Sequence, residues 1–232
     1  MVYLVSDLHG YPIEDIKKKF AEIGFCEKDR LYVLGDCIDR GKDGMNIIKW
    51  LMPQPNVTLI LGNHEAMLLK NRFLFEGDRI PGVLELHSEA RNNYAVWASN
   101  GGDVTIDSMG QFTASQIKYM IKYIERAPLY KEIEVGGVKY LLTHSGLGGF
   151  SVDKPIEDYM PYDLLWNRPS LNTRYYEDGR IVVFGHTPTV LFGSEYSGRP
   201  IFTETWIDID VGAAMGKRPV ILRLDDKKLF YI

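Results

Sequence analysis

The sequence predicts a layered fold that mixes α/β and α+β character, and three observations carry this prediction. Short apolar segments rich in β-branched residues recur along the chain. The first three alternate with segments of helical spacing, and a β-α-β-α-β order implies parallel strands joined by right-handed crossovers. The 232 residues, 45% hydrophobic and 25% charged, have the composition of a globular protein, and we expect a single domain over residues 1–232.

The elements follow from the apolar pattern. Nearly continuous apolarity predicts strands covered on both faces at residues 2–5, 31–34, 57–61, 138–143 and 181–184. Helical spacing predicts helices at residues 12–25, 45–51, 65–75 and 117–124. Residues 76 to about 112 show no clear period, so we interpret the stretch 71–127 as an inserted cap region. The remainder is mostly strand and hairpin, with turn signals at Gly136-Gly137 and Asp225-Asp226.

Charge and composition exclude several classes of protein. The formal charge is −4, and no basic run is longer than Lys17-Lys18-Lys19, so we expect no nucleic-acid partner. No stretch reaches the ~18 apolar residues of a membrane span, and residues 2–5 form an apolar run without a basic segment ahead of it, so we expect no leader. We therefore expect no membrane association and a cytoplasmic location. Cys26 and Cys37 do not form a disulfide framework or a thiolate zinc cluster.

Each predicted strand is followed at once by a polar loop with an unusual content of Asp, Asn and His. Loops at the carboxyl ends of strands in such sheets converge on one crevice, even when they are far apart in sequence. One loop histidine alone would be ordinary, but histidines recur in four of these loops. The loops are Ser-Asp-Leu-His-Gly at 6–10, Gly-Asp-Cys-Ile-Asp-Arg-Gly at 35–41, Gly-Asn-His-Glu at 62–65, His-Ser-Gly at 144–146 and Gly-His-Thr-Pro at 185–188.

The loops supply a set of ligands for metal ions. Carboxylate, imidazole and amide groups suit Mn, Fe, Zn or Ni, whereas the lack of thiolate argues against a structural zinc site. Six ligands are too many for one catalytic ion with open positions, and they suit two ions about 3.5–4 Å apart that share a carboxylate. We expect two divalent ions, Mn²⁺ before Fe, Zn or Ni, with Asp36 as the bridge. The candidate ligands are Asp7, His9, Asp36, Asn63, His144 and His186.

In their order along the chain, these motifs resemble the calcineurin-like metallophosphoesterases. They are most similar to the phosphoprotein phosphatase group, which includes bacterial and phage serine/threonine phosphatases and diadenosine tetraphosphate hydrolases. The motifs cover residues 6–187, and residues 207–224 resemble the closing strands of the group. The resemblance implies a four-layer αββα sandwich and an enzyme that hydrolyses phosphate esters with a hydroxide held by two metal ions.

The resemblance also implies a role for each matching residue. Asp7, His9 and Asp36 would hold the first metal, and Asp36, Asn63, His144 and His186 the second. His64 would be the general acid, oriented by Asp39. Arg40 and Arg168 would grip the phosphoryl oxygens, as the guanidinium fork suits phosphate; an ordinary surface arginine is the alternative for Arg168.

Two positions bear on the substrate and point in opposite directions. Leu61 stands where many protein phosphatases of the group carry an arginine, and here the chain resembles the tetraphosphate hydrolases. Asp39 matches the protein phosphatases and bears on the chemical step. We therefore predict a serine/threonine protein phosphatase-like phosphomonoesterase acting on a phosphorylated protein. The alternative is a bis(5'-nucleosyl)-tetraphosphatase; a phosphodiesterase is disfavoured by the acidic charge.

The cap region contains the aromatic residues Tyr94, Trp97 and Phe112. These rings could stack on a nucleobase or fill a small core. We expect the core role.

Overall fold

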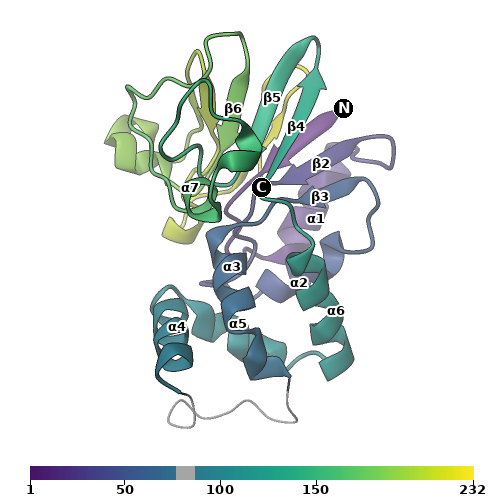
Figure 1. The fold of residues 1–232 in the computed structure, drawn as a ribbon. Helices are drawn as coiled ribbons and strands as arrows, with labels where there is room; N and C mark the ends of the chain where they lie inside the picture. Colours follow the sequence, from purple (N-terminus) through teal and green to yellow (C-terminus); the bar gives the residue numbers. More distant parts are fainter. Residues whose placement is uncertain (77–86) are drawn as a thin grey trace.

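The computed structural model describes residues 1–76 and 87–232 and contains two five-stranded sheets (Figure 1). The first sheet has the strand order β10-β9-β1-β2-β3, and the second has the order β4-β5-β6-β8-β7. Helices cover the outer face of the first sheet, while a short α-helix, Pro161–Leu165, and 3₁₀ helices lie outside the second. The four-layer αββα sandwich is therefore confirmed.

The first sheet begins as the sequence predicts. Strands β1 (Val2–Val5), β2 (Arg30–Val33) and β3 (Val57–Leu59) are parallel. Helices α1 (Ile13–Glu22) and α2 (Gly44–Leu51) form the crossovers. Strands β9 (Val220–Arg223) and β10 (Lys228–Tyr231) add an antiparallel edge beside β1.

The second sheet combines parallel and antiparallel pairs. Strands β5 (Val138–Thr143), β6 (Ile181–Phe184) and β8 (Trp206–Asp208) are parallel to one another. Strands β4 (Tyr130–Val135) and β7 (Ile201–Phe202) pair antiparallel at the two edges. Because β5 and β6 are parallel, the loops that follow them leave the same edge of the sheet.

Alternating side chains explain why the two sheets stack. In β1, Leu4 contributes to the core between the sheets, whereas Tyr3 and Val5 pack against the helices. In β6, Val183 faces the first sheet and Val182 packs in a third core on the outer side. Strands that are apolar on both faces need cover on both, and each buried Val or Leu contributes about 1.5–3 kcal/mol relative to exposure.

The cap region contains regular helices that its sequence, without a clear hydrophobic period, does not predict. It contains α4 (Ser88–Ser99) and α5 (Gly102–Met109), followed by the predicted helix α6 (Ala114–Glu125). Figure 1 shows these helices below the first sheet, at the end of the molecule away from the second sheet. Residues 77–86 of the region lie outside the described residues.

The predicted helix at 65–75 is interrupted. Helix α3 (Asn63–Lys70) ends at Asn71, and a 3₁₀ turn, Arg72–Phe75, follows it. The buried Asn71 side chain donates a hydrogen bond to Met67 O, in the preceding turn of the helix, at 2.9 Å. The backbone of Asn71 is no longer helical.

The outer face of the second sheet carries little regular structure. Its α-helix is the short α7 (Pro161–Leu165), and 3₁₀ turns at Ile156–Asp158, Thr189–Phe192, Ser194–Tyr196 and Ala213–Met215 surround it. Across the described ranges, no helix has the length and apolarity that a membrane span needs.

Candidate active site and metal centre

The polar loops predicted from the sequence meet at one place between the two sheets. Backbone hydrogen bonds join the first two loops, from Asp7 N to Gly35 O at 3.1 Å and from His9 N to Asp36 O at 2.8 Å. Gly185 N donates to His144 O at 2.8 Å and joins the last two. The side chains that follow separate strands are therefore brought together as expected.

The backbone at the site is held in an unusual conformation. Among the described residues, seven non-glycine residues have positive φ, and six of them are candidate site residues. Left-handed backbone costs on the order of 1–2 kcal/mol for residues other than glycine, although Asp and His tolerate it better than most. Such strain gathered in a few loops is typical of functional sites. The six residues are Asp7, His9, Asp36, Asp39, Arg40 and His186.

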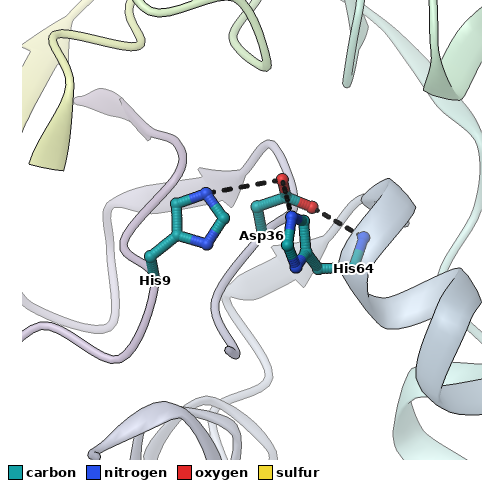
Figure 2. Close-up of side chains that lie close together, drawn as sticks. All are labelled: His9, Asp36 and His64. Carbon is teal, nitrogen blue, oxygen red and sulfur yellow. Dashed lines mark hydrogen bonds and ion pairs between the residues drawn. The ribbon is translucent and has the colours of Figure 1, made fainter. Parts of the chain in front are cut away.

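Asp36 lies at the centre of the site. Its Oδ2 is 3.7 Å from His9 Nε2 and 3.8 Å from His64 Nε2, and Figure 2 shows both rings turned towards it. Its Oδ1 is 3.4 Å from His144 Nε2. The ligand atoms of His9, Asp36 and His64 lie within 4.8 Å of one another, as do those of Asp36, His144 and His186. The one carboxylate thus belongs to both groups.

The remaining predicted ligands border these two groups. Asp7 Oδ1 lies 3.9 Å from His9 Nε2. Asn63 Oδ1 lies 2.8 Å from His144 Nε2 and 2.9 Å from His186 Nδ1. The structure therefore brings all six candidate ligands together, and His64, the predicted acid, is itself a member of the first group.

The donor atoms fit a cation. His144 Nδ1 lies 2.7 Å from Leu34 O, so this nitrogen donates and the lone pair of a neutral ring points from Nε2 at the oxygens of Asn63 and Asp36. His186 Nε2 is buried and has no hydrogen-bond partner among the described residues. A positive ion would satisfy these facing lone pairs, and carboxylate, amide and imidazole are suitable ligands for a divalent one.

The electrostatics of the buried groups agree with this reading. Burial lowers the pKa of His9 to about 3, and burial with the charge of His144 lowers the pKa of His186 to about 2, so both rings are in the neutral form that binds metals. Burial opposes the charge of His144, but Asp36 and Asp7 outweigh it and raise its pKa to about 10. Without a cation, a proton on His144 balances these carboxylates.

His64 and Asp39 form a buried pair beside Asp36. His64 Nδ1 lies 2.6 Å from Asp39 Oδ2 and donates to it, because a carboxylate can only accept. Burial lowers the pKa of His64, but the charge of Asp36 and the hydrogen bond to Asp39 raise it more, and the net pKa is raised. Nε2, the other ring nitrogen, faces Asp36 and Arg40.

The two arginines lie at opposite edges of the cluster. Arg40 Nη1 is 3.1 Å from His9 Nε2, and its Nη2 is 3.2 Å from His64 Nε2. Arg168 Nη1 donates to His186 O at 3.1 Å. Arg168 is exposed, and this hydrogen bond anchors it next to a candidate ligand.

Sequence reasoning assigned no role to Glu65, which is fully buried. Its carboxylate accepts from Asp36 N at 2.7 Å, Cys37 N at 2.8 Å and Gly62 N at 3.2 Å, so it ties the second loop to the third. Burial, with the charge of Asp36, raises its pKa to about 7. Its place directly after Asn63 and His64 in the polar loop was the available signal.

Two cap residues also reach the site. Trp97 is fully buried in the core, as expected, but its Nε1 donates to Asp39 Oδ2 at 2.9 Å. Thr105 donates to Asp39 Oδ1 at 2.6 Å. No spacing rule in the sequence connects these residues to Asp39.

Comparisons with known proteins agree with this geometry. A family model described as calcineurin-like phosphoesterase matches residues 1–208. Serine/threonine-protein phosphatase 1 of Salmonella typhimurium is 27% identical over 196 residues, which cover 81% of this chain and 78% of that protein. Serine/threonine-protein phosphatase 2 of Escherichia coli is 27% identical over 149 residues, which cover 64% of this chain and only 59% of that protein.

Other similar proteins are named tetraphosphatases. The asymmetrical bis(5'-nucleosyl)-tetraphosphatase of Oceanobacillus iheyensis is 22% identical, and the match covers 97% of this chain and 89% of that protein. A solved structure provisionally described as a diadenosine tetraphosphatase has a TM-score of 0.65 at 16% identity, covers 100% of this chain and 92% of its own, and shows the shared fold. Since the family match extends over strands β1 to β8 and every loop of the site, the chain belongs to the calcineurin-like phosphoesterases, the hydrolases of phosphate esters that its motifs resemble.

Proposed function

We propose that the protein is a phosphomonoesterase of the serine/threonine protein phosphatase type that works with two divalent metal ions. The observation that carries the proposal is the position of Asp36, whose carboxylate belongs to two separate groups of ligand atoms. A single buried carboxylate in contact with histidines on both sides is the arrangement that two ions with a shared ligand require.

The proposed ligands divide between the two ions as the resemblance implies. Asp7, His9 and Asp36 would hold the first, and Asp36, Asn63, His144 and His186 the second, with Mn²⁺ as the preferred metal and Fe, Zn or Ni as alternatives. Bound there, the ions would supply positive charge for the phosphoryl group and lower the pKa of a water molecule.

The chain's own residues would bind the phosphoryl group and move the proton. Arg40 and Arg168 would hold phosphoryl oxygens from two sides, since they flank the histidine cluster. His64 would donate a proton from Nε2 to the leaving oxygen, because Asp39 occupies Nδ1 and favours the charged ring. Arg40 now contacts His9 and His64, so its guanidinium would have to move to meet substrate.

The preference for a phosphoprotein substrate depends on the His64–Asp39 pair and on relatives named serine/threonine phosphatases. The alternative, a bis(5'-nucleosyl)-tetraphosphatase, is supported by Leu61 and by the tetraphosphatase relative that matches 97% of this chain. The side chain of Leu61 packs against the helix-covered core and offers no third clamp for phosphate. We further propose that residues 71–127 form a cap on a single domain, and that the protein is cytoplasmic with no nucleic-acid or membrane partner.

Hydrolysis of p-nitrophenyl phosphate by Mn²⁺-loaded protein tests the proposed activity. Asp36→Asn should reduce turnover to background. On phenyl phosphate, whose more basic leaving group depends on a general acid, His64→Asn should lower kcat by about 10²-fold or more. Asp15→Asn, a carboxylate exposed on α1, is the matched control and should retain activity. Failure of the loaded wild type to hydrolyse any phosphate ester would reject the proposal.

The substrate class is decided by comparing kcat/KM for phosphopeptides and for diadenosine tetraphosphate on the same preparation. We expect the phosphopeptides to be preferred. A preference of about tenfold or more for the dinucleotide, or about 1.4 kcal/mol in transition-state binding, would instead establish the alternative.

A further inference from the structure

The Asp39 carboxylate is enclosed by three side-chain donors. Asp39 is fully buried, and its Oδ2 accepts from both His64 Nδ1 at 2.6 Å and Trp97 Nε1 at 2.9 Å. Its Oδ1 accepts from Thr105 Oγ1 at 2.6 Å. A buried carboxylate needs such partners, and here two of the three come from the cap helices α4 and α5.

Thr105 holds Asp39 at two points. Its hydroxyl donates to Asp39 Oδ1 and accepts the backbone N–H of Asp39 at 3.0 Å. A hydroxyl has one proton and two lone pairs, so both bonds form at once. Together with Trp97, this fixes both the backbone position of Asp39 and the rotation of its carboxylate.

The junction between α4 and α5 is shaped to bring these donors close. Gly101 has φ +94°, and its carbonyl accepts from Arg40 N at 3.1 Å. A Cβ on Gly102 would lie 2.5 Å from the Trp97 ring. The glycine pair therefore allows the cap to approach residues 39 and 40 as closely as the hydrogen bonds need.

We propose that Trp97 and Thr105 are positioning residues that hold Asp39, and through it His64, in the orientation needed to protonate the leaving group. This role depends on the proposed function, and it makes the cap region the support of the general acid. Without these donors the carboxylate could rotate away from His64 Nδ1, and the ring would lose both its orientation and its fixed tautomer.

Dependence on the leaving group separates this role from a merely structural one. Phenolate is a far stronger base than p-nitrophenolate, so hydrolysis of phenyl phosphate depends much more on a general acid. Trp97→Phe and Thr105→Val should each lower kcat on phenyl phosphate by about tenfold or more and on p-nitrophenyl phosphate by less than about threefold, with KM little changed. Thr105→Ser keeps the hydroxyl and should restore most of the loss.

The matched control is Trp206→Phe. Trp206, in β8 of the second sheet, is also fully buried, and its Nε1 also donates at 2.9 Å, but to Thr173 O in the loop between α7 and β6. Any activity lost through general destabilisation should then fall equally on both esters. Equal losses on both esters in Trp97→Phe and Thr105→Val would overturn the proposal.

A second measurement stands apart from turnover. In ¹H–¹⁵N spectra of the metal-free protein, the indole resonance of Trp97, assigned through Trp97→Phe, should move when Asp39 is replaced by Ala, while that of Trp206 stays in place. A Trp97 resonance that does not move would reject the positioning role. If wild type hydrolyses neither ester, the proposed function fails, whether or not this resonance moves.

Discussion

Gly62→Ala should disturb both proposed metal sites at once. A Cβ at position 62 would lie 2.3 Å from Asp36 Oδ1 and 2.4 Å from Asp36 N. Gly62 has φ −95° and ψ 167°, an extended backbone that alanine adopts freely, so the effect is steric rather than conformational. The second loop must move away from the third, and the shared carboxylate moves with it.

The expected magnitude follows from the contacts. Forcing one extra carbon into a packed site costs about 1–3 kcal/mol, which corresponds to a fall of roughly 2–12 °C in Tm for a chain of this size. Because Asp36 is proposed to serve both ions, the affinity for both should fall by about 10–100-fold together. Gly185→Ala is the variant to compare with it. Its Cβ would lie 2.1 Å from Asp7 Oδ2, so the affinity for only one of the two ions should fall.

Calorimetric titration with Mn²⁺ and thermal unfolding measure these effects. Gly110→Ala is the control, because its Cβ would meet Asp107 O at 3.4 Å, an ordinary contact, with φ −59°. The steric argument is wrong if Gly62→Ala has the Tm and the Mn²⁺ affinity of the wild type. Loss of one ion only would show that Asp36 is not shared.

Two further predictions concern pH and the phosphate clamp. In EDTA, the free energy of unfolding should fall as the pH rises from 7 to 9. The folded protein raises the pKa of His144 from the usual 6.5 to about 10, so binding of this proton stabilises the fold. The stabilisation is fully present below pH 6.5 and is lost as the pH rises through 10. A Tm that rises over this interval contradicts the assignment. Arg168→Ala should raise KM for phosphate esters by about tenfold, whereas Arg174→Ala, an exposed arginine paired with Glu204, should not; equal KM values for the two variants would exclude the clamp.

The sequence predicted those parts of the fold that depend on hydrophobic periodicity and on the order of strands and helices along the chain. Apolar runs at β1, β2, β5 and β6 stand directly before polar loops, and parallel strands place such loops at one edge. The candidate ligands were therefore recognisable without knowledge of any distance. The roles proposed for His64 and Asp39 came from the family resemblance and not from this pattern.

Helices α4 and α5 were missed for a physical reason. The buried residues of α4 are Ala90 and Trp97, too few for an amphipathic stripe. Those of α5 are Gly102, Thr105, Ser108 and Met109, most of them small or polar, so hydrophobic periodicity does not detect the helix. Of these buried residues, Trp97 and Thr105 contact Asp39.

The place of Glu65 after Asn63 and His64 marked it as part of the polar loop, but its role could not be predicted, because it acts on backbone groups. It accepts N–H groups of Asp36 and Cys37, and such a contact between distant segments leaves no pattern in the spacing of either. The contacts of Trp97 and Thr105 with Asp39 are of the same kind, since they join residues 58 and 66 positions apart.

The central claim is that Asp36 bridges two metal ions, and electron paramagnetic resonance of the Mn²⁺-loaded protein tests it most directly. Two ions joined by one carboxylate are magnetically coupled, so at two equivalents of Mn²⁺ the signal of isolated ions should give way to that of a coupled pair. Asp36→Asn should abolish the coupled signal. A wild-type spectrum that shows only isolated Mn²⁺ at every ratio would contradict the account.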